Sequence, residues 1–340
     1  MRRGRADPYG RTMTETNARA RPEPGVERRP RADDDRVADF RRAQQRVLQR
    51  YGVAARSQQV RVPQLGIDVH VLVAGEGPPV LMAIGGGMVA GLWAPLMAQL
   101  TGHTTIAFDP PGHGLSDAHP YSTRTLRSTA VGLVDGLLDE FGVGRAPIVA
   151  QSMGGLWSTW YALDRPARVS AISYLGCPAL LLGTSAPLPL RLGTIRPLHL
   201  LVDRFMAPST RQVERLGRMA GEPLDELPEL RDLFLAYERL PGSAAELLDL
   251  HRAAIRVRGA RPEVALRADQ LRAVRQPAQF VWGTRDPFGP PDVGRRAADL
   301  MPDAEFHLVD TGHGPWFTRP ADVGALVSNF LDRPMERTTT

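Results

Sequence analysis

Lysine is absent from this 340-residue sequence, and cysteine occurs only once, at Cys177. A single cysteine excludes an intramolecular disulfide bond and leaves the redox compartment undetermined. The sequence also lacks an uninterrupted apolar run of about 18 residues, so we expect no stable membrane insertion. No apolar segment follows the N-terminal arginines, which argues against a secretory signal and makes the cytoplasm the expected location.

With lysine absent, all 42 fixed basic side chains are arginines, and 37 acidic residues leave a formal net charge of only +5. The arginines are interleaved with Asp and Glu along the chain rather than gathered in one stripe. Recognition of nucleic acid needs such a stripe, so we expect no nucleic-acid partner. The expected partner is a small-molecule substrate, and the composition does not indicate an oligomeric state.

Residues 1–35 are rich in Arg, Pro, Asp and Glu and poor in apolar residues. Such a segment buries too little apolar surface to offset its ordering entropy, so it predicts a disordered N-terminal tail. Residues 333–340 are predicted to form a similar C-terminal tail, and Met13 is an alternative start of the chain. Apolar residues at helical spacing across 35–51 predict an amphipathic helix that packs on the domain.

Short apolar strands alternate with amphipathic helices over residues 36–178 and again over 276–332. This alternation predicts an α/β fold, a three-layer α/β/α sandwich with a mostly parallel sheet. Residues 179–275 are helical in pattern and punctuated by proline, and we expect them to form a cap over the carboxyl edge of the sheet, where ligands bind. The expected strands are 60–62, 69–73, 80–84, 104–108, 146–150, 169–175, 279–282 and 305–309, and the expected helices outside the cap include 92–100, 123–141, 152–164, 291–300 and 315–331.

The strongest local signal is the run A-Q-S-M-G at residues 150–154, between an apolar strand and a helix. Small residues two before and two after the serine allow the close backbone approach of a very tight turn. Such a turn exposes the hydroxyl at a helix N-terminus, where developing negative charge is favoured. We therefore predict that Ser152 is a nucleophile; the alternative is a structural serine in a glycine-rich turn.

A serine nucleophile needs a base, and the base needs an orienting acid. His313 follows the last strand and precedes the last helix, on the same sheet edge as Ser152, and is the predicted base. His113 and His119, after the fourth strand, are the competitors. Asp286 lies in the loop after the preceding strand, 27 residues before His313, and is the predicted acid.

The oxyanion formed on attack needs backbone donors, and losing one donor typically costs about 2.7–4 kcal/mol of transition-state stabilisation. The N–H groups of Met153 and of Gly86, in the glycine run after the third strand, are the predicted pair. The leucines of the cap, with Trp157 and Trp316 near the same edge, predict an apolar substrate pocket, although both tryptophans are also compatible with the core. Arginines of the cap are candidates for a substrate carboxylate, with solvent exposure as the simpler interpretation: Arg191, Arg196 and Arg204.

Together these motifs resemble the α/β-hydrolase superfamily across about residues 60–331. The serine turn is similar to the family's G-x-S-x-G elbow. The run D-P-P-G-H-G-L-S at residues 109–116 is similar to the family's D-x-x-G-x-G-x-S turn, and the run G-H-G-P at residues 312–315 is similar to its G-H-x-P ending. The resemblance implies an eight-stranded sheet, a helical cap, no cofactor or metal, and a Ser–Asp–His triad. One departure is Ile84, which stands where the family often has the histidine before its oxyanion residue.

We therefore expect a carboxylesterase-like serine hydrolase (EC 3.1.1) that cleaves an ester, thioester or lactone of a small, largely apolar substrate through an acyl-enzyme. Serine at the elbow argues against epoxide hydrolase and haloalkane dehalogenase chemistry, which use aspartate there. The motifs also resemble those of carbon–carbon hydrolases and perhydrolases and leave the subfamily unresolved. Two alternatives stay open: a C–C bond hydrolase of a meta-cleavage-type diketone acid, and a non-catalytic protein that binds a small ligand on the same fold.

Overall fold

The computed structural model describes residues 34–197 and 207–333. The alternative start at Met13 and most of the two predicted tails lie outside these residues. The predicted N-terminal tail, residues 1–35, is too long at its end, because helix α1 (Asp35–Arg50) already begins at Asp35. The Asp34 carboxylate caps this helix by accepting a hydrogen bond from the Arg36 N–H, which explains why the helix starts at this point.

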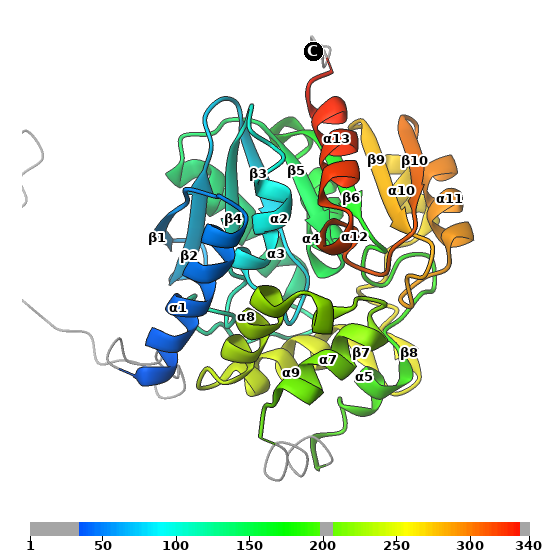
Figure 1. The fold of residues 1–340 in the computed structure, drawn as a ribbon. Coiled ribbons are helices and arrows are strands. Elements are labelled where there is room, and N and C mark those ends of the chain that lie inside the picture. Colours follow the sequence, from blue (N-terminus) through cyan, green and yellow to red (C-terminus); the bar gives the residue numbers. More distant parts are fainter. Residues whose placement is uncertain (1–33, 198–206, 334–340) are drawn as a thin grey trace, which may run out of the picture.

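Eight strands form one sheet in the order β1-β2-β4-β3-β5-β6-β9-β10 (Figure 1). All neighbours from β4 to β10 pair in parallel, and β2 is antiparallel to both of its neighbours. The inner strands are apolar and buried because helices cover both faces, whereas β1 at one edge alternates between exposed and buried residues. The strands are β1 (Arg56–Val62), β2 (Ile67–Ala74), β3 (Pro79–Ala83), β4 (Thr104–Phe108), β5 (Ala146–Gln151), β6 (Val169–Leu175), β9 (Ala278–Gly283) and β10 (Ala304–Val309).

Two separate hydrophobic clusters, one on each face of the sheet, hold the helical layers. One layer contains α3 (Leu126–Glu140), α4 (Met153–Asp164), α10 (Ala268–Ala273) and α11 (Pro291–Leu300). The other contains α1, η1 (Ala90–Trp93), α2 (Ala94–Met97), α12 (Pro315–Thr318) and α13 (Pro320–Leu331). The predicted three-layer sandwich with a mostly parallel, eight-stranded sheet is confirmed.

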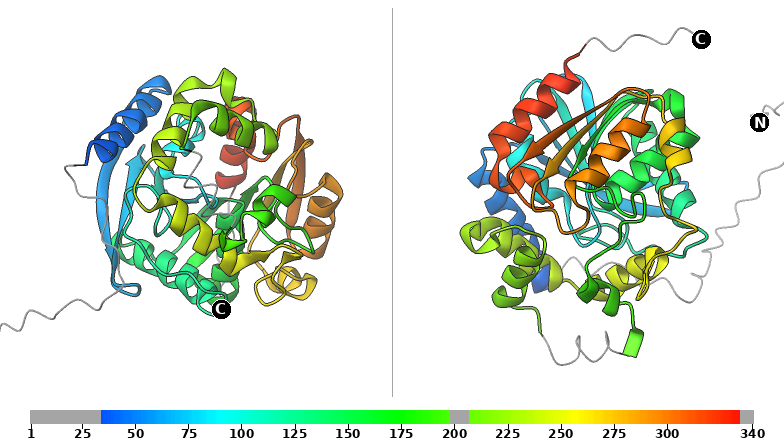
Figure 2. Two further views of the ribbon diagram at one scale, coloured as in Figure 1. Left: turned by 90° about the horizontal axis from the view of Figure 1, so that it is seen from below. Right: turned by 90° about the vertical axis from the view of Figure 1, so that its right-hand side faces the viewer.

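A cap of short elements lies beyond the carboxyl ends of the parallel strands (Figures 1 and 2). Helix α10 falls inside the predicted cap range 179–275 but contacts α4 and α11, so the cap ends before it. Helix α1 packs against α8 of the cap and thereby links cap and core. The cap elements are α5 (Leu188–Leu192), α7 (Thr210–Met219), η3 (Leu224–Glu226), α8 (Pro228–Glu238), α9 (Ser243–Ala254), β7 (Ile255–Arg256) and β8 (Gly259–Ala260).

Two predicted helices differ from those observed. The single helix expected over 315–331 is divided into α12 and α13 at Arg319, whose φ of −126° and ψ of 51° are not helical. Pro320 is the cause, since proline disfavours the α conformation in the residue before it and cannot donate a backbone hydrogen bond. The helix expected over 92–100 is a 3₁₀ turn followed by one α turn that ends at Met97.

Candidate active site

Ser152 lies at the junction of β5 and α4 and has a left-handed backbone, with φ of 51° and ψ of −113°. Non-glycine residues rarely adopt this conformation, and such strain is concentrated at functional sites. The turn closes because Gly154 has no side chain: a Cβ there would lie 2.0 Å from the Ala83 carbonyl oxygen. The backbone arrangement predicted from the A-Q-S-M-G run is present.

His313 and Asp286 are hydrogen bonded to each other. The imidazole Nδ1 lies 2.9 and 3.0 Å from the two oxygens of the buried Asp286 carboxylate. This carboxylate also accepts hydrogen bonds from the N–H groups of Cys177, at 2.8 Å, and Phe288, at 2.9 Å. With Nδ1–H as the donor to Asp286, Nε2 is left as an acceptor. Nε2 is buried and has no hydrogen-bond partner among the described residues.

The loop of His313 is fixed from several sides. Its N–H donates to the Ala220 carbonyl at 2.9 Å, and its carbonyl accepts from Gln151 Nε2 at 3.3 Å. The Phe288 ring stacks on the imidazole with a centroid distance of 4.0 Å. The ring orientation is therefore set by an acid, an aromatic face and backbone contacts from both cap and core.

Gly86 and Met153, the predicted oxyanion donors, lie next to each other. A Cβ built on Gly86 would lie 4.0 Å from the Met153 Cβ. Neither N–H donates a hydrogen bond to any residue that the structure describes. Both residues line the same cavity as Ser152, so their role as oxyanion donors stays a prediction that this arrangement permits.

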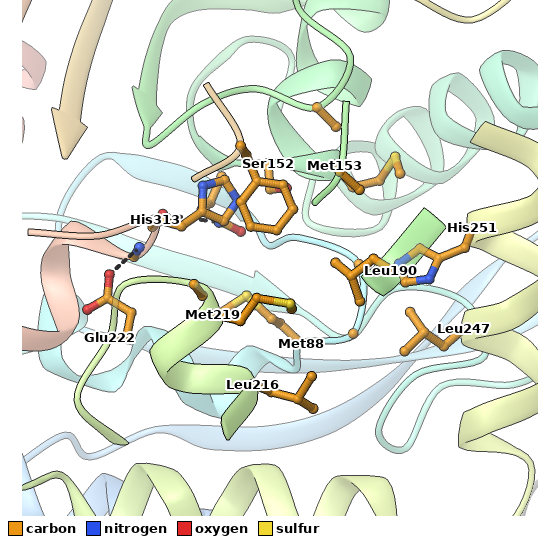
Figure 3. A pocket seen from close by; sticks show the side chains of 18 of the residues that line it. Met88, Ser152, Met153, Leu190, Leu216, Met219, Glu222, Leu247, His251 and His313 are labelled. Carbon is orange, nitrogen blue, oxygen red and sulfur yellow. Dashed lines mark hydrogen bonds between the residues drawn. The ribbon is translucent and has the colours of Figure 1, made fainter. Parts of the chain in front are cut away.

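One cavity between sheet and cap joins these groups (Figure 3). Its walls are mainly apolar, and within the described ranges its lining includes no arginine. Its basic side chains are His251 and His313, and its acidic ones are Glu222 and Glu238. Burial raises the pKa of Glu238 to about 7 and that of Glu222 to about 8. Figure 3 labels the main lining residues: Met88, Ser152, Met153, Leu190, Leu216, Met219, Glu222, Leu247, His251 and His313.

Trp157 and Trp316, predicted to bind substrate, do not line this cavity. Trp157 is buried in the core beside Tyr121, and Trp316 stacks on Trp93 at 4.2 Å while its Nε1–H donates to the Leu92 carbonyl. Both predictions were wrong, because a helix that begins at the active-site edge directs most of its side chains onto the sheet. Two of the substrate arginine candidates also do not line the cavity: Arg191 donates to the Val257 carbonyl, and Arg196 is exposed. The third candidate, Arg204, lies outside the described residues.

The competing histidines have other contacts. His113 is fully buried, its Nδ1 lies 3.0 Å from the Pro111 carbonyl oxygen, and burial lowers its pKa. His119 contacts Thr129 at 3.3 Å. The 109–116 turn is organised by Asp109, whose carboxylate accepts from the N–H groups of Ala90 and Leu115 and contacts His70. This turn therefore has a structural role. In the described ranges, no group of three metal-ligating side chains is close enough to hold a metal.

Three acidic or basic residues of the cavity wall were not predicted from the sequence: Glu222, Glu238 and His251. Glu222, in the cap, is buried and accepts a hydrogen bond from the Gly314 N–H at 2.8 Å. His251, on α9, lines the cavity about 60 residues before His313. None of the three lies in a motif, and their positions depend on how the cap folds onto the sheet. No helix in the part of the chain that the structure describes is long and apolar enough to cross a membrane.

Residues 78–213 match the family model described as the alpha/beta hydrolase fold. The chain is 27% identical over 285 residues to a 2-hydroxy-6-oxononadienedioate/2-hydroxy-6-oxononatrienedioate hydrolase of a Pseudomonas species, covering 78% of this chain and 92% of that protein. It is 25% identical over 285 residues to a 2-hydroxy-6-oxo-6-phenylhexa-2,4-dienoate hydrolase of Comamonas testosteroni, and the match covers 77% of this chain and 91% of that protein.

Solved structures share the fold. Carboxylesterase CesB from Bacillus subtilis superposes with a TM-score of 0.69 at 18% identity, over 88% of this chain and 99% of that one. The 2-hydroxy-6-oxo-6-phenylhexa-2,4-dienoate hydrolase of Rhodococcus sp. strain RHA1 also has a TM-score of 0.69, at 19% identity over 83% of this chain and 100% of that one. Since an esterase and a C–C hydrolase fit equally well, the fold alone does not select a substrate.

Proposed function

Because the chain belongs to the α/β-hydrolase superfamily, we propose that it is a serine hydrolase in which Ser152 attacks the carbonyl carbon of a small substrate. His313 accepts the hydroxyl proton at Nε2, and Asp286 stabilises the resulting imidazolium. The N–H groups of Gly86 and Met153 bind the oxyanion. The observation that carries this proposal is the Asp286–His313 pair, with a free Nε2, in the same cavity as the strained Ser152.

The bond that breaks is proposed to be a carbon–carbon bond next to a ketone. The sequence alone favours ester hydrolysis, but the relatives named above are hydrolases of 2-hydroxy-6-oxo-dienoates and favour the C–C alternative. The mainly apolar walls and the absence of arginine from the described lining support a substrate with an apolar group such as phenyl. A substrate with two carboxylates fits less well, because uncompensated charges are costly to desolvate.

The reaction balances without a cofactor. The 2-hydroxy-dienoate first tautomerises to the 2,6-diketone, so that the proton of the 2-hydroxyl is exchanged for one on C5. The serine oxygen then adds to the C6 ketone carbon, the C5–C6 bond breaks, and its electron pair leaves as an enolate conjugated to the C2 ketone. The proton held by His313 neutralises this leaving group. Water then attacks the acyl-serine with His313 as base and releases the carboxylic acid.

The test compares wild type, Ser152→Ala and Ser128→Ala, an exposed serine on α3 that serves as control. We expect wild type and Ser128→Ala to consume 2-hydroxy-6-oxo-6-phenylhexa-2,4-dienoate and to react with a fluorophosphonate probe. Ser152→Ala loses both by several orders of magnitude. Equal turnover by wild type and Ser152→Ala removes Ser152 from the mechanism.

A carboxylic ester is the second candidate, because the apolar cavity also accommodates an uncharged acyl group. Short p-nitrophenyl esters distinguish the two. Ester turnover by wild type without consumption of the dienoate selects the ester, and the opposite result selects the C–C bond.

A further inference from the structure

A segment of the cap, residues 220–222, lies against the loop of His313. Two successive N–H groups of this loop donate to it: His313 to the Ala220 carbonyl at 2.9 Å, and Gly314 to Glu222 Oε1 at 2.8 Å. Figure 3 shows the carboxyl of Glu222 directed at the loop. The backbone on both sides of the imidazole is thus held by the cap rather than by the sheet alone.

The two backbones are in direct contact. A Cβ on Gly312 would lie 2.5 Å from the carbonyl carbon and oxygen of Gly221, and one on Gly221 would lie 2.9 Å from the Gly312 Cα. Gly221 also has φ of +78°, which favours glycine at this turn. This close approach leaves no room for the loop to shift toward the cap, and the hydrogen bonds oppose a shift away from it.

Glu222 as a whole residue is 3% exposed, and its Oε2 has no hydrogen-bond partner among the described residues. Burial is the main cause of its raised pKa of about 8, and the charge of Asp286 raises it further. The Gly314 N–H and Arg285 act in the opposite direction. At neutral pH the neutral acid is therefore favoured, so Glu222 positions the loop without adding a second carboxylate beside the imidazole.

We propose that Glu222 is a positioning residue, which holds the loop of His313 through the Gly314 N–H and so fixes the imidazole relative to Ser152. This inference rests on the proposed function of the triad. The preceding helix α7 supplies Leu216 and Met219 to the cavity wall. One stretch of the cap therefore both contacts the substrate space and holds the base.

The experiment uses the full-length protein with two substitutions at Glu222. Glu222→Gln keeps the acceptor oxygen and matches the neutral acid, so kcat stays within about threefold of wild type. Glu222→Leu removes the acceptor, and we expect kcat to fall about 10- to 100-fold with KM nearly unchanged, because a misplacement of about 1 Å can cost this much. The control is Glu229→Leu, a cap carboxylate outside the cavity near Arg50, which leaves kcat unchanged.

The rate of fluorophosphonate labelling is measured in parallel, since it requires Ser152 and His313 but not the natural substrate. A wild-type protein that is not labelled contradicts the proposed function. If the wild type is labelled and Glu222→Leu is labelled at the same rate, the result contradicts only the role of Glu222. Thermal unfolding checks each variant. Should Glu222→Leu fail to fold, Glu222→Met, which keeps the side-chain length without an acceptor, is used with the same expectation.

Discussion

Replacing Glu222 by Gln changes how the stability of the protein depends on pH. In the folded protein the pKa of this carboxyl is about 8, against an ordinary value of 4.5. Between these values the folded state keeps a proton that the unfolded chain has lost, so the free energy of unfolding falls as pH rises from about 4.5 to about 8. At about 1.4 kcal/mol for each pH unit, Glu222 accounts for a loss of roughly 4–5 kcal/mol across this window. The amide in the Glu222→Gln variant does not titrate in this window, so the loss disappears in the variant.

The assay is urea denaturation of wild type and Glu222→Gln at several pH values from about 5 to about 9. Glu238, whose pKa of about 7 is also raised by burial, contributes with the same sign in both proteins and cancels in the comparison. We expect the difference in unfolding free energy to move steadily in favour of the variant as pH rises, and to level off above about pH 8. Stability curves that run parallel over the whole range refute the assignment of a neutral, buried Glu222.

Three further predictions concern the elbow, the acid and the thiol. Gly154→Ala forces a Cβ to 2.0 Å from the Ala83 carbonyl oxygen and lowers the free energy of unfolding by about 3 kcal/mol or more, whereas Gly144→Ala, with open space around it, changes it by less than about 0.5 kcal/mol in denaturant titrations. Asp286→Asn keeps the shape of the acid but not its charge, and its NH2 group faces the N–H of either Cys177 or Phe288, so we expect kcat of the folded protein to fall by about four orders of magnitude and the melting temperature to fall as well; a fall in kcat of less than tenfold contradicts its role. Burial raises the pKa of the Cys177 thiol well above its usual range, so a thiol reagent at neutral pH modifies it only after unfolding, and rapid labelling of the native protein contradicts this.

The sequence predicted those parts of the site that depend on local backbone geometry. The turn at Ser152 requires small residues at fixed offsets, and Gly154 meets the Ala83 carbonyl as such a turn demands. The loop of His313 was found because it falls between a strand and a helix of clear pattern. Alternation of apolar strands with amphipathic helices likewise predicted β4, β6 and α11 with the residue bounds observed.

The sequence did not predict whether a side chain near the active-site edge faces the cavity or the hydrophobic core. Trp157 and Trp316 are near the active-site edge in sequence, but helix packing places both in the core. Glu222 and His251 reach the cavity because the cap folds back over the sheet, and no periodicity specifies which cap residues face inward. The break at Arg319 is different, because Pro320 is a local signal in the sequence that disfavours the α conformation of Arg319.

The residues of the serine turn and the His313 loop could be predicted and those of the cap could not, for a physical reason that also bears on function. The elbow and the histidine loop are constrained by backbone contacts that few residues satisfy, so their chemistry is visible in the sequence. The cap is constrained only to be apolar where it faces the cavity, which many sequences satisfy. Because residues 220–222 also hold the histidine loop, a change in cap packing alters both the substrate space and the position of the base. From the proposed role of Glu222 we expect selectivity and rate to be coupled through the cap, so that substitutions in α7 that reshape the cavity leave kcat unchanged only where they leave the hydrogen bond between Glu222 and Gly314 intact.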